Sequence, residues 1–244
     1  MPVFSLLTVN IEGDNHLNEI EIFVREKQPD VLCVQEIFSE DVALFQKVLG
    51  VRAYFAPMCR VEHENPFRLS ARGEWGVAIF SRLPIESISV LAYEGELNHI
   101  PIYDNDNPNS VNRVLLVAKI KTGMNSFFVA TTHFTWTNHG EVTPLQHQHL
   151  DAMFELLHEH NPLVLCGDFN APRGKSVFAR LASKYKDNIP ADITTTIDQH
   201  LHRTQGIQFV VDGVFTTPEL KVEKIEVIDG VSDHQAIFAA IASP

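Results

Sequence analysis

Several apolar segments of this chain lead directly into side chains that can bind a metal ion or move a proton. Residues 163–166 form a short apolar run typical of a buried strand, and Asp168 and Asn170 follow it two positions apart. Because side chains alternate along an extended chain, an acid and an amide at this spacing can point the same way. Asn170 also precedes Ala171 and Pro172, so a plain turn with an Asx cap is an alternative interpretation.

The same arrangement recurs along the chain. Other apolar runs, at residues 4–9, 31–34, 127–130 and 209–211, also lead to polar groups. The polar side chains concerned are Asn10, Glu36, His133 and Asp212, to which Ser232-Asp233-His234 is added near the C-terminus. Open α/β sheets bind ligands at the carboxyl ends of their strands. We therefore expect these side chains to converge on one polar site.

The chemistry of such a site follows from its residue types. Glu36, Asp168, Asp212 and Asp233 cannot all be ionised in one cleft without a cation or protons between them. Oxygen ligands with few thiols nearby favour Mg²⁺ or Mn²⁺, and zinc fits less well. A metal polarises a phosphoryl group, a carboxylate or imidazole helps to activate water, and amides hold developing charge. The set predicts a phosphoester hydrolase.

Length and charge restrict the remaining possibilities. The chain has 244 residues and a net charge of −12, so we expect a single catalytic domain over residues 1–244 and no general affinity for nucleic acid. The three cysteines form no disulfide framework. No apolar run approaches the roughly 18 residues of a membrane span, and no signal peptide is evident. We expect a cytoplasmic monomer.

Strand and helix patterns alternate along the chain. Helical spacing of apolar residues predicts helices over residues 17–25, after Ser39, after Thr143 and over about 174–183. Thr143-Pro144-Leu145-Gln146 offers the third of these a cap and a proline in its first turn. Further strands are expected over residues 75–80, 85–91, 111–120, 208–215, 222–228 and 235–241, with long loops over 58–74 and 93–110. This order suggests two sheets packed face to face with helices outside.

The ordered set of motifs resembles the endonuclease/exonuclease/phosphatase family over nearly the full chain. The motifs are Asn10, Gln35-Glu36, the strand from Gly76 to Ser81, Thr132-His133, Gly167-Asp168-Phe169-Asn170, Asp212 and Ser232-Asp233-His234. The family includes deoxyribonuclease I-like nucleases, apurinic endonucleases, sphingomyelinases and inositol-phosphate phosphatases. The resemblance implies a four-layered α/β/β/α sandwich of two packed mixed β-sheets with outer helices. It also implies hydrolysis of phosphoesters with a divalent metal.

The resemblance further implies individual roles. Glu36 would be the principal metal ligand, with Asn10 beside it and Asp233 facing the metal region. Asp168 would orient or deprotonate the attacking water, and His234, oriented by Asp212, would contact the phosphoryl oxygens and transfer a proton. Which of Asp168 and His234 is the base stays open, as does the number of metal ions.

Other positions are implied as phosphate ligands or their supports. Asn170 and His133 would bind the scissile phosphate, and Arg113 fits a phosphate-contacting arginine of the deoxyribonuclease I-like branch. Glu74 would be the carboxylate partner of His133 in that branch. Glu12 has no clear role. Arg60, Arg68 and Arg72 form either a basic loop for the substrate or a plain solvated loop. The histidines at 139, 147, 149, 158 and 160 lack ligand spacing, and they are interpreted as solvated.

Two classes of function compete. The favoured hypothesis is a metal-dependent phosphoesterase acting on a phosphodiester or phosphomonoester, with a small or flexible substrate preferred. A DNA or RNA nuclease is the alternative within the enzymes, so nucleic acid is a possible but not favoured partner. A binding protein that kept the fold without catalysis is the rival class, and the complete set of polar residues argues against it.

We predict weak binding to duplex DNA at physiological salt. Thirty-one acidic residues against nineteen basic ones oppose a polyanion, and a duplex binder needs several Lys or Arg on phosphates. Fluorescence anisotropy of a labelled duplex at two salt concentrations, with Ca²⁺ replacing Mg²⁺, measures the affinity. Plasmid nicking with Mg²⁺ measures the activity. Submicromolar affinity with a steep salt dependence, together with efficient nicking, would contradict the prediction and favour the nuclease.

Overall fold

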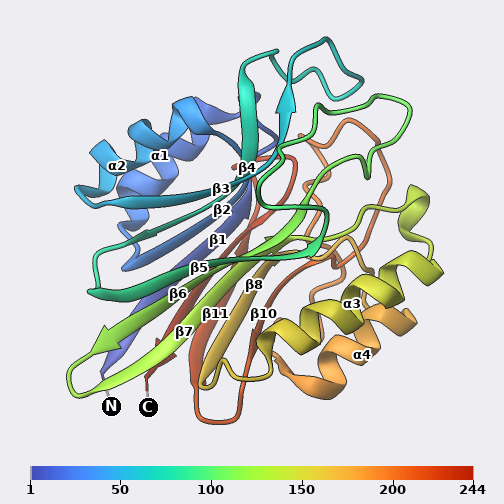
Figure 1. Ribbon diagram of the computed structural model, residues 1–244. Helices are drawn as coiled ribbons and strands as arrows, with labels where there is room; N and C mark the ends of the chain where they lie inside the picture. The colour runs from blue at the N-terminus through green and yellow to red at the C-terminus, as the bar shows by residue number, and fades with distance from the viewer. Residues whose placement is uncertain (1, 244) are drawn as a thin grey trace.

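Two mixed β-sheets form the centre of the protein (Figure 1); the computed structural model describes residues 2–243. The first sheet contains, in spatial order, β11 (Lys221–Ile228), β12 (Ala236–Ala242), β1 (Val3–Asn10), β2 (Val31–Phe38), β4 (Gly73–Ser81) and β3 (Ala53–Val61). The second sheet contains β5 (Ile85–Glu94), β6 (Arg113–Thr122), β7 (Asn125–His133), β8 (Leu163–Asp168), β10 (Asp212–Thr216) and β9 (Lys186–Asp187). The helices are α1 (Leu17–Lys27), α2 (Val42–Leu49), α3 (Pro144–Leu157) and α4 (Ser176–Lys184), with 3₁₀ turns at Ser39–Asp41 and Asn138–Gly140.

Alternating apolar side chains hold the layers together. In β1, Leu6 packs into the core between the two sheets, whereas Leu7 packs outward with residues of α1 and α2. In β8, Val164 packs between the sheets, and Leu165 packs outward with residues of α3 and α4. Strands that are buried on both faces read as continuous apolar runs, as these do. The expected four-layered α/β/β/α sandwich is confirmed, with α1 and α2 on one outer face and α3 and α4 on the other (Figure 1).

Each sheet has one parallel strand pair at its centre, and these pairs position the site. β1 and β2 run parallel and are connected through α1, while β7 and β8 run parallel and are connected through α3. Parallel strands have their carboxyl ends at the same edge, so Asn10 lies beside Gln35, and His133 lies beside Asp168. The polar ends of both pairs are therefore available to one site.

The expected helices are present, with one difference in capping. Thr143 caps α3 as predicted, since its side chain accepts a hydrogen bond from the Gln146 backbone N–H. Ser39, predicted to cap the second helix, instead begins a 3₁₀ turn, and α2 starts at Val42. The N-cap position of α2 is Asp41, and its side chain makes no capping bond.

The predicted loop over residues 58–74 is wrong in its first part. Residues 58–61 belong to β3, an edge strand that pairs with β4. The strand contains Pro57, and the pairing register shifts between Pro57 and Cys59. Proline is confined to edge strands and bulges because it lacks the N–H of a sheet ladder. A proline-interrupted edge strand carries a weak sequence signal, which explains the error.

The strand expected over residues 208–215 begins later than predicted. β10 starts at Asp212, so this aspartate opens a strand instead of following one. Because β10 runs antiparallel to β8, the start of β10 lies at the end of β8, and Asp212 pairs with Asp168. The error in the boundary leaves Asp212 at the expected edge of the sheet.

No helix in the part of the chain that the structure describes is long and apolar enough to cross a membrane.

We predict that Gly167→Ala destabilises the fold. Gly167 has a φ of +133°, and a Cβ atom there would lie 2.1 Å from the Thr132 carbonyl oxygen of the adjacent strand. Backbone strain and overpacking together should cost about 2 kcal/mol or more in the free energy of unfolding. Gly123→Ala is the matched control, because Gly123 also has a positive φ (+61°) but an added Cβ meets nothing within 4 Å. Urea denaturation of both variants measures the difference; equal losses would contradict the prediction.

Candidate active site

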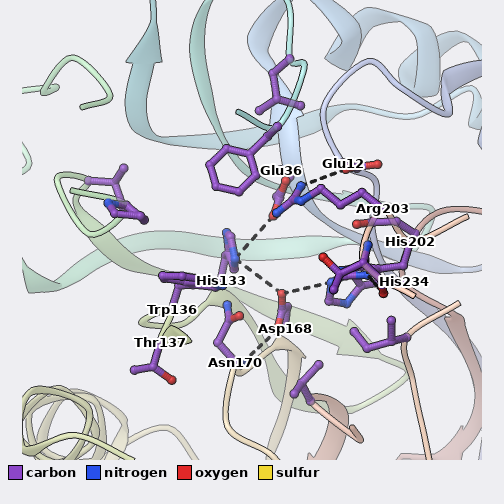
Figure 2. Close-up of a pocket in the computed structure, with 18 of the residues that line it drawn as sticks. Glu12, Glu36, His133, Trp136, Thr137, Asp168, Asn170, His202, Arg203 and His234 are labelled. Atoms are coloured by element: carbon purple, nitrogen blue, oxygen red, sulfur yellow. Dashed lines mark hydrogen bonds and ion pairs between the residues drawn. The ribbon is translucent and has the colours of Figure 1, made fainter. Parts of the chain in front are cut away.

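The predicted polar residues meet where β1, β7 and β8 end and β10 begins (Figure 2). In the second sheet, Asp168 lies between His133 on one neighbouring strand and Asp212 on the other. The two sheets are joined at this edge because Asn10 Nδ2 donates to Asp168 Oδ2 over 3.1 Å. The fold thus converts separate strand ends into one cluster.

A β-bulge directs Glu36 into the cluster, although β2 continues to Phe38. The register of β2 against β4 shifts between Gln35 and Ile37, and Glu36 has a φ of +62°. Non-glycine residues in the left-handed region are strained and concentrate at functional sites. Glu36 Oε1 accepts a hydrogen bond from Asn10 Nδ2 at 2.9 Å. One amide group therefore connects the carboxylates of Glu36 and Asp168.

This orientation of Asn10 differs from the expected role of a metal ligand. The amide nitrogen faces the two carboxylates, and the amide oxygen accepts a hydrogen bond from the Glu12 backbone N–H at 3.1 Å. A metal would bind the oxygen, because an amide NH₂ group offers no lone pair to a cation. In the structure Asn10 acts as a donor to Glu36 and Asp168.

Asp168 is the centre of the cluster. Its carboxylate is buried, and Oδ1 accepts a hydrogen bond from the Asn170 backbone N–H at 2.8 Å. Oδ2 lies 3.5 Å from His133 Nε2 and 3.9 Å from His234 Nε2. Hydrogen bonds from Asn10 and Asn170 therefore fix the position of the Asp168 carboxylate between the two imidazoles.

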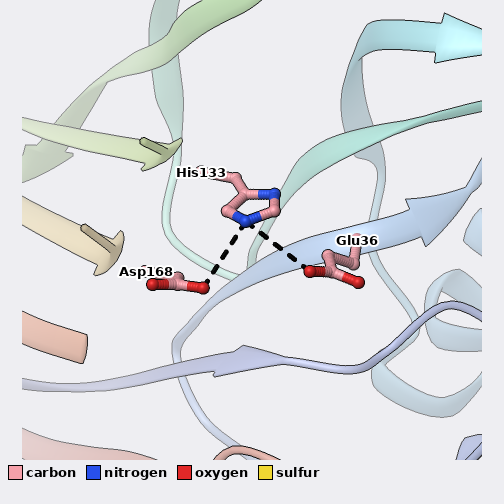
Figure 3. A group of neighbouring side chains, drawn as sticks. All are labelled: Glu36, His133 and Asp168. Atoms are coloured by element: carbon pink, nitrogen blue, oxygen red, sulfur yellow. Dashed lines mark ion pairs between the residues drawn. The ribbon is translucent and has the colours of Figure 1, made fainter. Parts of the chain in front are cut away.

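The imidazole of His133 lies between two carboxylates. Figure 3 shows Nε2 facing Glu36 Oε1 at 3.6 Å and Asp168 Oδ2 at 3.5 Å. Burial lowers the pKa of His133 to about 3 despite the opposing effect of Asp168, so the ring is neutral at physiological pH. Ligand atoms of Glu36, His133 and Asp168 all lie within 4.8 Å of one another, which is close enough to share a metal ion.

Glu74 is not the partner of His133 that the sequence led us to expect. His133 Nδ1 is buried and has no hydrogen-bond partner among the described residues. The neighbour of the ring is instead Trp75, at 5.5 Å between ring centroids. Side chains alternate along β4, so an inward Trp75 leaves Glu74 on the opposite face. Glu74 pairs in register with Arg60 of β3.

His234 and Asp212 form a directed pair. His234 Nδ1 lies 2.9 Å from Asp212 Oδ2, and both residues are buried. Burial alone would lower the pKa of His234, but the carboxylates of Asp212, Asp168 and Asp233 outweigh it and raise this pKa well above its usual value. The hydrogen bond from Nδ1 leaves Nε2 directed toward Asp168. Asp168, Asp212 and His234 form a second group of closely spaced ligand atoms.

Glu36 is difficult to ionise where it stands. Burial, followed by the charge of Asp233, raises the pKa of Glu36 from 4.5 to about 8, and the hydrogen bond from Asn10 only partly offsets this. Asp233 is buried too, and burial raises its own pKa. Asp233 therefore acts on Glu36 through its charge but is not a member of either closely spaced group. A nearby cation would relieve the repulsion between these acids.

The expected phosphate ligands Asn170 and Arg113 line the same cavity, and both are engaged with backbone. Asn170 Nδ2 donates to the Phe134 carbonyl at 3.1 Å. Arg113 is buried, and its Nη1 donates to the carbonyls of His133 and Phe134, each at 3.0 Å. These bonds fix the backbone that carries His133 at the end of β7.

The cavity beside the cluster has a volume of about 220 Å³ and contains residues that the sequence did not single out. Five aromatic side chains contribute to its wall: Phe67, Trp75, Tyr103, Trp136 and Phe209. Arg203 and His202 reach the cavity from the segment before β10 (Figure 2). Nothing in the sequence indicated these residues, because loop conformation decides which loop side chains face a site.

Two arginines of the proposed basic loop, Arg60 and Arg72, pair with acids, whereas Arg68 is exposed. Arg72 contacts Asp41 at 2.8 Å and Glu40 at 3.2 Å, and Arg60 contacts Glu62 at 3.1 Å.

The prediction that the histidines at 139, 147, 149, 158 and 160 are solvated is wrong for His149, which is buried. It lies 2.7 Å from Thr135 Oγ1 and 3.1 Å from Glu94 Oε2. None of these histidines belongs to a closely spaced ligand group among the described residues.

Comparisons with known proteins identify the family and agree with the fold. The sequence profile of the Endonuclease/Exonuclease/phosphatase family matches residues 7–234. Nocturnin from Drosophila melanogaster is 24% identical over 224 residues; the match covers 83% of this chain but 32% of that relative, so the chain spans about a third of its length. The crystal structure of an endonuclease/exonuclease/phosphatase from Beutenbergia cavernae has a TM-score of 0.76 at 18% identity, covering 100% of this chain and 72% of that one. A mannosyl-6-phosphatase from Bacteroides thetaiotaomicron has a TM-score of 0.70 at 16% identity, covering 98% and 99%.

Members of this family are hydrolases that act on phosphoesters. The profile extends over most of the chain, and the fold is the one that the sequence resemblance implied. The chain belongs to the endonuclease/exonuclease/phosphatase family.

Proposed function

We propose that the protein is a divalent-metal-dependent phosphoesterase that hydrolyses a phosphodiester or phosphomonoester by in-line attack of water. The observation that carries the proposal is the cluster of a half-buried Glu36 with the buried Asp168, His133 and His234 in the wall of one cavity. Several acids crowded into one poorly hydrated cluster are costly, and such clusters with perturbed pKa values are typical of functional sites. Its combination of carboxylates, imidazoles and amides suits phosphoryl chemistry.

The donor set fits Mg²⁺ or Mn²⁺. Glu36 is the principal ligand in this proposal, since its raised pKa reflects a charge that lacks a counter-ion. Asp233 adds charge nearby, and a carboxylate oxygen of Asp168 lies within 4.8 Å of the Glu36 ligand oxygen. Direct ligation by Asn10 would require its amide to turn over, so we assign Asn10 to positioning the two carboxylates. When bound, the cation supplies electrostatic stabilisation of the phosphoryl oxygens.

Asp168 and His234 divide the proton chemistry in this proposal. Asp168 is held by hydrogen bonds from Asn10 and Asn170, which suits a carboxylate that orients and deprotonates water. His234 has a raised pKa because of Asp212 and its neighbours, so it is protonated and donates to a phosphoryl oxygen through Nε2. The neutral His133 donates one N–H to the phosphate.

Arg113 has a different part from the one its motif implied. Its guanidinium donates hydrogen bonds to the carbonyls of His133 and Phe134, so we propose that it positions His133. Glu74 is not proposed as part of the site.

The proposed substrate is a small or flexible phosphoester. The chain has a net charge of −12, which opposes a polyanion, and two of the three arginines of the expected basic loop, Arg60 and Arg72, are paired with acids. The structural neighbour from Bacteroides thetaiotaomicron is described as a mannosyl-6-phosphatase, which supports a small substrate for this site. A nuclease is the alternative, because the family also contains endonucleases and exonucleases.

We predict that hydrolysis of bis-p-nitrophenyl phosphate stops in excess EDTA and returns with Mg²⁺ or Mn²⁺. Glu36→Gln keeps the shape of the side chain but removes the ligand charge, so its apparent metal affinity should fall by roughly 10- to 100-fold. Metal titration of activity measures the change. Glu155→Gln is the control, because Glu155 is exposed on α3. Full turnover in EDTA would sink the metal assignment.

We predict that Asp168→Ala and His234→Ala each lower kcat by about 10²- to 10⁴-fold, the worth of a positioned acid or base. Asp212→Asn should lower kcat by about 10-fold or more, because His234 loses the charge that favours its protonated form. Asp229→Asn controls for a nearby acid, since Asp229 is exposed. Circular dichroism confirms folding of each variant. Folded alanine variants with near wild-type kcat would show that these residues do not form the catalytic site.

A further inference from the structure

The mouth of the cavity is crossed by one arginine. Arg203 lies in the segment before β10, and its side chain extends over the cluster near Glu36 (Figure 2). Arg203 Nη1 lies 3.2 Å from Glu12 Oε1, and its guanidinium carbon lies 4.2 Å from the ring centroid of Phe67. Glu12 follows β1, and Phe67 lies between β3 and β4. Arg203 thus joins segments from both sides of the site; we call Arg203, Glu12 and Phe67 the Arg203 bridge.

The two partners of Arg203 are themselves fixed. Glu12 is buried, and its second oxygen, Oε2, lies 3.1 Å from His16 Nε2. Phe67 packs edge-on against Tyr103 at 6.0 Å between ring centroids. A guanidinium held by a carboxylate on one side and an aromatic face on another has little freedom to move. The contact with Arg203 also gives Glu12 the role that the sequence left open.

The segment that carries Arg203 is anchored to the catalytic elements at its base. The Asp198 carboxylate accepts hydrogen bonds from the backbone N–H groups of His200 (2.8 Å), Leu201 (2.9 Å) and Gly230 (2.7 Å). The Asp198 backbone N–H donates to the Asp233 carbonyl at 2.9 Å, next to His234. The turn that leads to Arg203 is therefore anchored beside His234.

We propose that Arg203 is a specificity-determining residue that restricts the site to small phosphoesters. This inference rests on the proposed phosphoesterase function. The cavity beneath the bridge has about 220 Å³, less than the roughly 300 Å³ at which pockets for drug-sized ligands begin. A single phosphoryl group with a small substituent fits beneath Arg203. A nucleic-acid strand, which continues on both sides of the scissile phosphate, is obstructed by the bridge.

The activity test compares two substrates. For each variant, kcat/KM is measured with p-nitrophenyl phosphate, which has one phosphoryl group and one small substituent, and with a single-stranded oligonucleotide. Arg203→Ala should raise the ratio of oligonucleotide to small-substrate kcat/KM by about fivefold, the equivalent of one ion pair. Glu12→Gln, which releases Arg203, should change the ratio in the same direction.

The loss of positive charge and the loss of the obstruction should change oligonucleotide hydrolysis in opposite directions. Removing a positive charge should weaken binding of a polyanion, so an increase for the oligonucleotide opposes the simple effect of charge. Arg60→Ala is the matched control, because it also removes an arginine but one that pairs with Glu62 and does not line the cavity. An unchanged or lowered ratio in Arg203→Ala, equal to that of Arg60→Ala, would overturn the proposal.

A second measurement does not depend on activity. The two tryptophans of the chain, Trp75 and Trp136, both line the cavity. If Arg203 covers this cavity, Arg203→Ala should increase quenching of tryptophan fluorescence by the neutral quencher acrylamide, and Arg60→Ala should not. Identical Stern–Volmer constants in wild type and Arg203→Ala would contradict the bridge. If the wild type hydrolyses neither substrate, the proposed function fails, and the quenching result still decides whether Arg203 covers the site.

Discussion

The site depends on one interaction, the bridge that the Asn10 amide makes between the carboxylates of Glu36 and Asp168. Glu36 belongs to the first sheet and Asp168 to the second, so the same amide joins the two halves of the sandwich. Two carboxylates this close repel each other, and one amide group cannot neutralise both. Burial and the charge of Asp233 raise the pKa of Glu36 further, and Asp168 adds a smaller effect. The other polar groups of the site are arranged around this excess of negative charge.

The directions of the strands bring these polar groups to one edge of the sandwich. Each sheet has a central parallel pair, and its carboxyl ends deliver polar side chains to the shared edge. Local departures from regular structure complete the set: a bulge turns Glu36 inward, and β10 opens on Asp212 beside Asp168. Behind the cluster, Arg113 fixes the backbone of His133, and Asp198 fixes the segment that carries Arg203 over the cavity. Acidic side chains are concentrated at one end of the cavity, and Arg203 restricts access at its mouth.

The residues at the strand ends could be predicted from the sequence, whereas the orientations of their side chains could not. The convergence of Asn10, Glu36, His133 and Asp168 could be predicted, because apolar runs with polar ends mark the edges of buried strands. The direction of the Asn10 amide and the absence of a Glu74 contact to His133 depend on packing between strands that are remote in sequence. Pro57 hid the edge strand β3, and Arg203 lies in a segment without a pattern. A loop residue such as Arg203 can be assigned to the site only when the residues that it contacts, Glu12 and Phe67, have been placed in the fold.

The central claim is that a divalent cation binds the Glu36 carboxylate and compensates its charge. Calorimetric titration with Mn²⁺ near neutral pH, in buffers of different ionisation enthalpy, counts the protons released on binding. Because the pKa of Glu36 is about 8, the carboxyl is largely protonated without metal and must lose its proton to become a ligand. The account predicts release of about one proton by the wild type and clearly less by Glu36→Gln, which also binds more weakly. Tight Mn²⁺ binding without proton release, unchanged by Glu36→Gln, would contradict it.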